Sequence, residues 1–160
     1  MAELRPTPDR VRETLFNWLH PVIDGAVCLD LFAGSGVLGF EALSRGAGSV
    51  FMVENNRMLH DKLQEQAKRL GAENLEIIHA DGLQWLKNQT RRFDVVFIDP
   101  PFSQGLVEIA CRHLLDYGIL GRGGLVYVES EPGLEIQIQG LEKIKEGKAG
   151  KVQYQLLEYR

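Results

Sequence analysis

The sequence is poor in cysteine and lacks any long apolar run. Its two cysteines, Cys28 and Cys111, are too few and too far apart for a disulfide framework. Both lie among apolar residues, so we expect reduced thiols in the core. No apolar stretch approaches the roughly 18 residues that a membrane span needs, and the first ten residues do not resemble a signal peptide. These absences predict a cytoplasmic protein without a membrane anchor.

An excess of positive charge is also absent. The formal net charge is −4, whereas nucleic-acid phosphates are bound mainly by lysine and arginine. Any contact with RNA must therefore be local. Two basic stretches are available, near the start and near the end, and their members are Arg5, Arg10, Arg12, Lys143, Lys145, Lys148 and Lys151. Such stretches more often form a solvated face than a binding site.

Length and composition fit one folded domain. The chain has 160 residues, of which 44% are hydrophobic and 25% charged, values typical of soluble globular proteins. The four histidines, at positions 20, 60, 79 and 113, do not have the spacing of metal ligands. We therefore predict a single domain over residues 1–160 and no metal site.

Strands and helices alternate along the chain. Residues 1–24 form a helical segment, in which Thr7 and Pro8 predict the N-cap and the first turn, and residues 25–160 form the predicted core. Short aliphatic runs predict strands at residues 26–31, 50–53, 75–79, 93–98 and 125–129. Helices are predicted at residues 37–44, 56–70, 83–87 and 106–117. Segments 141–145 and 152–159, around Gly147 to Gly150, predict an antiparallel hairpin. The pattern indicates an α/β fold whose parallel sheet is covered on both faces.

A glycine-rich loop joins the first predicted strand to the following helix. Gly34, Gly36 and Gly39 have the spacing G-x-G-x-x-G, and Glu54 follows at the end of the next strand. Such glycines let the backbone approach a ligand, the helix N-terminus offers free N–H groups, and the acidic residue accepts hydrogen bonds from a ribose. The pattern is typical of a site for NAD or for S-adenosylmethionine.

Asp30 favours S-adenosylmethionine. Its carboxylate lies where the pyrophosphate of a nicotinamide cofactor would be, and it would repel phosphate but attract an ammonium and a sulfonium. Asp81 follows the third strand, where it can accept a hydrogen bond from an adenine amino group. Taken singly, Asp30 and Asp81 are equally compatible with loop caps, but with Glu54 they mark three successive strand ends, where ligands bind. The predicted cofactor-binding residues are Asp30, Gly34, Ser35, Gly36, Glu54, Asp81 and Gly82.

The sharpest motif is the segment Asp99-Pro100-Pro101-Phe102. Two successive prolines remove two backbone donors and favour extended conformations. The Asp99 carboxylate and the Pro100 carbonyl can then accept both hydrogens of an exocyclic amine and turn its lone pair toward a methyl donor. Phe102 can stack on a base that has left its helix. We predict that these four residues are catalytic, whereas an isolated Pro-Pro pair would more often end a strand.

These residues resemble the RsmD family, bacterial methyltransferases that act on guanine N2 of 16S ribosomal RNA. The resemblance extends over essentially the whole chain. It is based on RPTPDRVRETLFNWL at 5–19, DLFAGSG at 30–36, EALSRG at 41–46, DPPF at 99–102 and VYVES at 126–130. DNA and RNA amino-methyltransferases share DPPF, so the opening segment joined to it is more specific.

The resemblance implies a Rossmann-like class I methyltransferase with a seven-stranded, mostly parallel sheet whose last strand is antiparallel. It implies S-adenosylmethionine as the cofactor and places residues 99–102 at the target guanine. The expected partner is 16S ribosomal RNA in an assembling small subunit, and the candidates for RNA contacts are Arg5, Thr7, Arg10 and Arg12. Family members usually have a basic β-hairpin before the Arg5 segment, whereas four residues precede it here, so we expect a smaller docking surface.

Two alternatives stay open. An adenine or cytosine amino-methyltransferase acting on DNA or RNA would share residues 99–102, but a DNA enzyme needs a target-recognition region for which 160 residues leave little room. An NAD-dependent oxidoreductase or a nucleotide-binding module would share the glycine loop. Asp30 and the Pro100-Pro101 corner argue against this second class.

Overall fold

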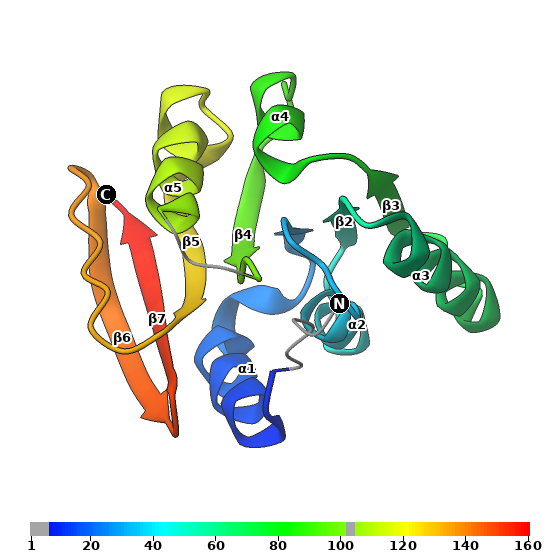
Figure 1. Cartoon of the computed structure of the whole chain (residues 1–160), viewed down its shortest axis with the longest axis horizontal. Helices are drawn as coiled ribbons and strands as arrows, with labels where there is room; N and C mark the ends of the chain where they lie inside the picture. Colours follow the sequence, from blue (N-terminus) through cyan, green and yellow to red (C-terminus); the bar gives the residue numbers. More distant parts are fainter. Residues whose placement is uncertain (1–6, 102–104) are drawn as a thin grey trace.

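One mixed sheet organises the protein, and its strand order is β3-β2-β1-β4-β5-β7-β6 (Figure 1). The computed structural model describes residues 7–101 and 105–160. The strands are β1 (Val27–Asp30), β2 (Ser49–Glu54), β3 (Leu75–His79), β4 (Phe93–Ile98), β5 (Leu120–Ser130), β6 (Leu141–Ala149) and β7 (Val152–Tyr159). Strands β1 to β5 are parallel, whereas β7 is antiparallel to both β5 and β6. The predicted α/β fold and the antiparallel last strand are therefore confirmed.

Helices cover both faces of the sheet. They are α1 (Asp9–Ile23), α2 (Val37–Ser44), α3 (Arg57–Leu70), α4 (Gly82–Lys87) and α5 (Leu106–Asp116). Side chains of α1, α2 and α3 join one buried cluster, and those of α4 and α5 join the other. Along β4, Val95 and Phe97 belong to the first cluster and Val96 and Ile98 to the second. This central strand is therefore apolar on both sides, as parallel strands usually are.

Within the described ranges, no helix is long and apolar enough to cross a membrane. Cys28 and Cys111 are both buried and unpaired with each other, as expected for core thiols.

The start of α1 differs from the prediction. Thr7 is not its N-cap, because the helix begins at Asp9, Pro8 takes the cap position and no side chain caps it. The Thr7 hydroxyl instead donates to Glu129 at 2.9 Å. This hydrogen bond fixes the buried Thr7 side chain against the end of β5. Nearer its C-terminal end, α1 packs on the sheet through Trp18, whose ring stacks on that of Tyr154 in β7 with 5.4 Å between the ring centroids.

Strands β5 and β6 are longer than predicted, whereas β7 has the predicted bounds. β5 begins at Leu120 rather than at residue 125, with an irregularity in its pairing to β4. β6 continues through Gly147, so the turn is reduced to Gly150 and Lys151. Gly147 belongs to the strand because the Tyr154 ring covers it, and a Cβ there would lie 2.5 Å from that ring. The glycine makes room for an aromatic side chain instead of forming the turn.

The strand order reverses direction between β1 and β4. The chain proceeds from β1 outward through β2 to β3 and then returns to the other side of β1 as β4. Such a switch point opens a crevice at the carboxyl ends of the strands, where ligands bind in open α/β sheets. Asp30 ends β1 and Asp99 follows β4, so the topology places the two predicted site segments at this crevice.

Candidate active site

A cleft of about 840 Å³ opens at the carboxyl ends of the parallel strands, within the usual size of a small-molecule site. Ten of the predicted site residues line it, namely Thr7, Asp30, Gly34, Ser35, Glu54, Asp81, Gly82, Asp99, Pro100 and Pro101. Gly36, Arg10 and Arg12 are not part of its wall. Arg5 and Phe102 lie outside the described residues.

Gly36 builds the turn that brings the loop to the cleft. Its φ of 83° is in the left-handed region, where side chains are rarely tolerated. A Cβ at this position would lie 2.6 Å from both Leu63 and the Phe40 ring. Gly36 therefore has a structural reason to be glycine, while Gly34 and Ser35 beside it face the cleft.

Glu54 connects the glycine loop to the start of α3. Its Oε1 accepts a hydrogen bond from the Gly34 N–H at 2.7 Å, and its Oε2 accepts one from the Asn56 N–H at 2.8 Å. Each carboxylate oxygen can accept a second hydrogen bond. Glu54 is thus fixed in position at the cleft and retains acceptor capacity for two hydroxyl groups.

Asp30 is a nearly fully buried carboxyl on the floor of the cleft. It is 2% exposed, and its Oδ2 accepts a hydrogen bond from the Gly39 N–H at 3.1 Å. Burial raises the pKa of Asp30 to about 7, the Gly39 hydrogen bond opposes this, and Glu54 and Glu129 add further repulsion. No lysine or arginine of the described segments forms an ion pair with it. The position therefore favours a cationic ligand group.

Asp81 caps a helix and lines the cleft at the same time. It is the N-cap of α4, since its Oδ2 accepts from the Gln84 N–H at 3.1 Å, and it also lines the cleft. Gly82 beside it packs closely against the loop after β1, because a Cβ there would be 3.0 Å from the Leu31 carbonyl oxygen. Asp81 is thus held at the cleft by the helix that it caps.

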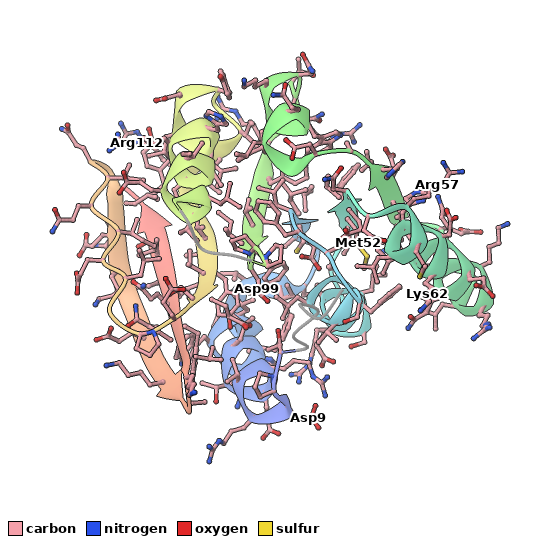
Figure 2. All side chains as sticks on the ribbon, viewed as in Figure 1. Asp9, Met52, Arg57, Lys62, Asp99 and Arg112 are labelled. Carbon is pink, nitrogen blue, oxygen red and sulfur yellow. The ribbon has the colours of Figure 1, made fainter. Side chains whose placement is uncertain are left out.

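Asp99 lies at the centre of the molecule, beside the tip of β4 (Figure 2). Glu129, at the end of β5, lines the same cleft, and the residues before the two acids, Ile98 and Val128, are paired in the sheet. Glu129 is 6% exposed, and its Oε2 accepts from the hydroxyls of Thr7 at 2.9 Å and Tyr127 at 2.7 Å. Burial raises the pKa of Glu129, whereas the hydrogen bonds from Tyr127 and Thr7 act in the opposite direction.

Glu129 is absent from the residues that we predicted to act in the site. The available signal was an acidic residue directly after the apolar run 125–128, at the same edge as the other strand-end acids. One of its partners, Thr7, is 122 residues away in sequence, so no local pattern could reveal this contact.

The remaining candidates for RNA contacts differ in exposure. The Thr7 side chain is buried and its hydroxyl is used by Glu129. Arg12 forms ion pairs with Asp9 at 3.2 Å and Glu41 at 3.7 Å, whereas Arg10 is exposed and has no acidic partner among the described residues. Within these residues there is also no cluster of three or more side chains suited to a metal ion.

Comparisons with known proteins agree on one family. A family model described as Conserved hypothetical protein 95 matches residues 1–158. The Escherichia coli K12 protein "Ribosomal RNA small subunit methyltransferase D" is 44% identical over 157 residues, which cover 97% of this chain and 79% of that protein. A solved Escherichia coli structure, yhhF, described as a candidate methyltransferase, is 42% identical with a TM-score of 0.93, covering 98% of this chain and 88% of that one.

A more distant structure shares the fold. It is an RNA methyltransferase from Salinibacter ruber in complex with S-adenosyl-L-homocysteine, 17% identical with a TM-score of 0.74. The match covers 95% of this chain and 92% of that one. The class I methyltransferase fold is therefore shown by close and distant structures alike.

The buried Asp30 carboxyl predicts a pH-dependent stability. Its pKa is about 7 in the folded protein, above the ordinary value of 3.8, so the folded state binds more protons between these values. The stability that the protonated Asp30 carboxyl contributes is fully present below pH 3.8 and is lost as the pH rises through about 7. It amounts to roughly 1.4 kcal/mol per unit of pKa difference. We expect Asp30→Asn to be more stable than the parent at pH 8, with a gap that narrows toward pH 5. Urea unfolding at several pH values measures it, and an identical pH dependence in both proteins would contradict the assignment.

Proposed function

Because the chain belongs to the family of the ribosomal RNA small subunit methyltransferase D proteins, we propose that it transfers a methyl group from S-adenosylmethionine to N2 of a guanine in 16S ribosomal RNA. The observation that supports this most strongly is the juxtaposition of Asp99 and Pro100 with an acid-lined cleft at the switch point of the sheet. One methyltransferase domain over residues 1–160 and a cytoplasmic location, where ribosomal subunits assemble, are part of the proposal.

The cleft has the groups that S-adenosylmethionine requires. In our proposal Asp30 binds the ammonium group, Glu54 accepts the ribose hydroxyls, Asp81 accepts the adenine amine, and the loop at Gly34 and Ser35 approaches the cofactor closely. A buried carboxyl that has no basic partner in the described part of the chain fits a cationic ligand better than a pyrophosphate. The dinucleotide-binding alternative is disfavoured for the same reason. When bound, S-adenosylmethionine supplies a methyl group on a sulfonium that an amine can attack.

The corner after β4 orients the amine. The Asp99 carboxylate and the Pro100 carbonyl accept the two hydrogens of guanine N2, so the nitrogen lone pair points away from them. Pro100 and Pro101 offer no N–H that would compete for these acceptors. The residues thereby contribute by positioning and by stabilising the positive charge that develops on nitrogen. Asp99 then accepts the proton that the methylated amine releases.

The RNA backbone requires a separate surface, and we propose the turn between β6 and β7. Lys145, Lys148 and Lys151 are exposed and have no acidic partner within the described part of the chain. Lys151 lines the mouth of the cleft, and Lys148 lies in the register row of Ser130, the last residue of β5. Figure 1 shows this turn at the end of the sheet where β4 also ends.

The rest of the hairpin is neutralised by ion pairs. Lys143 pairs with Glu146 at 2.9 Å, and Arg160 pairs with Glu142 and Glu158, each at 2.8 Å. Positive charge is thus concentrated at the cleft end of the hairpin, where phosphates next to a guanine in the cleft would lie. In a protein of net charge −4, such local charge is what RNA binding needs.

The experiment that tests the function is identification of the methylated nucleoside. The protein is incubated with methyl-labelled S-adenosylmethionine and small ribosomal subunits from cells that lack such modifications, and the RNA is then digested. We expect labelled N2-methylguanosine. Label in adenine or cytosine would retain the chemistry and overturn the base assignment, and absence of label in small-subunit RNA would overturn the proposal.

Replacement of Asp99 separates chemistry from cofactor binding. Asp99→Ala removes the acceptor for the amine, so we expect loss of methyl transfer by about 100-fold or more. Binding of S-adenosylmethionine, measured by calorimetry, should stay within a few-fold of the parent. Loss of cofactor binding and transfer together would show that Asp99 has a structural role instead.

Removal of two lysines tests the docking surface. Lys148→Ala/Lys151→Ala should weaken binding of small-subunit RNA and reduce the slope of log Kd against log salt by about two, while cofactor affinity is unchanged. The matched control is Lys62→Ala/Lys68→Ala, which removes two exposed lysines from α3, on the opposite side of the molecule (Figure 2); neither has an ion pair with another described residue. Equal effects of the two double variants would refute a specific role for the turn.

A further inference from the structure

Glu129 is a carboxyl group in the cleft wall to which the proposed chemistry gives no role. It is the last residue but one of β5, and it is buried although it lines the cleft. The hydroxyls of Thr7 and Tyr127 both donate to its Oε2, at 2.9 and 2.7 Å. Two donors on one oxygen stabilise the ionised form and fix the orientation of the group. A carboxylate has about four acceptor positions, so Glu129 retains acceptor capacity for a ligand in the cleft.

Glu129 lies one strand away from the corner that orients the amine. Ile98 of β4 and Val128 of β5 are register partners, so Asp99 and Glu129 follow them at the same level of two neighbouring strands. Such strands are about 4.8 Å apart, and both acids line the cleft. A base whose amine reaches Asp99 therefore presents the adjacent ring atom toward Glu129.

That ring atom differs between the bases. In guanine, N1 beside the 2-amino group carries a hydrogen. In adenine, N1 beside the 6-amino group has a lone pair instead, and so has N3 beside the 4-amino group of cytosine. A carboxylate accepts a hydrogen bond from an N–H and repels a lone pair. Enzymes that act on an extruded base read it by hydrogen bonds to this edge, so a carboxylate beside the amine favours guanine.

We infer that Glu129 determines the base specificity, by accepting the N1 hydrogen of the guanine whose amine is held by Asp99. The inference rests on the proposed function, in which Asp99 contacts the amine, and it names the residue that selects the base. Such a residue is needed because adenine and cytosine amino-methyltransferases share the motif at residues 99–102. Thr7 links the N-terminal segment to this selection, since its hydroxyl holds Glu129.

Electrostatics make the selection strong. Asp99 and Glu129 repel each other as neighbouring carboxylates, and guanine offers a hydrogen-bond donor to each of them. Adenine or cytosine would offer a donor to Asp99 only and would place a lone pair against the buried charge of Glu129. Sites built to bind an N–H of the substrate reject analogues that lack it by large factors, because a buried polar group is then left unpaired.

Base analogues test the N1 contact in the parent protein. 16S RNA is ligated so that the position that acquires the label carries guanine, 2-aminopurine or N1-methylguanine, and it is assembled into small subunits. 2-Aminopurine lacks the N1 hydrogen and O6, whereas N1-methylguanine lacks the N1 hydrogen and keeps O6; both keep the 2-amino group. We expect kcat/KM to be lower by about 100-fold or more for both analogues. Transfer to either analogue at the rate for guanine would refute the contact, and this test needs no variant protein.

Replacement of Glu129 assigns the contact to this residue. In Glu129→Gln the side-chain carbonyl can accept from Thr7 and Tyr127, which turns the amide N–H toward the base. This group donates to the N1 lone pair of 2-aminopurine and opposes the N1 hydrogen of guanine. We expect the ratio of kcat/KM for guanine to that for 2-aminopurine to fall by about 100-fold, with the Kd of S-adenosylmethionine within a few-fold of the parent.

The ratio separates recognition from a structural role, which would slow both substrates equally. The control is Glu142→Gln, an exposed residue of β6 outside the cleft wall, which should retain the parent's ratio. A Glu129→Gln variant that also retains this ratio would overturn the inference.

Nucleotide binding separates this inference from the proposed function. The parent protein, saturated with S-adenosylhomocysteine, is titrated with guanosine monophosphate and adenosine monophosphate and followed by NMR. We expect at least about 10-fold tighter binding of the guanine nucleotide, and loss of this preference in Glu129→Gln. A parent without the preference, whether both nucleotides bind alike or neither binds, refutes the inference even when guanine in RNA is methylated. If the preference is found and no small-subunit RNA is methylated, the proposed function fails while the base selection stands.

Discussion

Repulsion between carboxyl groups is the constraint on which the arrangement of the cleft depends. The parallel sheet brings Asp30, Glu54, Asp99 and Glu129 to one edge, because each stands at or just after the carboxyl end of a strand. Three of them are held by hydrogen bonds. The Gly39 N–H binds Asp30, two backbone N–H groups bind Glu54, and the hydroxyls of Thr7 and Tyr127 bind Glu129. The apolar clusters on both faces of the sheet keep these groups in place.

Most of the fold could be predicted from the sequence because its signals are local. Apolar runs determine the strands, and glycine at Gly36 is required by a turn whose φ is positive. The edge at which Asp30, Glu54 and Asp81 gather follows from the α/β alternation alone. The topology predicts where these side chains lie but not which ligand they bind. Their roles therefore stay proposals.

Long-range contacts account for the parts that sequence reasoning missed. Thr7 has the local pattern of an N-cap, but its hydroxyl donates a hydrogen bond to Glu129, 122 residues away in sequence. Gly147 has the pattern of a turn, but the ring of Tyr154 on the neighbouring strand occupies the space that a side chain would need. In both cases a local preference of about 1 kcal/mol is overruled by a tertiary contact.

The distribution of charge suits a substrate that is part neutral and part anionic. The carboxyls on the floor of the cleft favour a cationic cofactor and a neutral base that donates hydrogen bonds, and they repel phosphate. Lysines are placed at the rim, where Lys151 lines the mouth and Lys148 lies close to the end of β5. A nucleotide would therefore enter with its base inward and its phosphates outside. The net negative charge of the protein is then compatible with RNA binding, because the acidic groups would contact the base and the basic groups would contact the backbone.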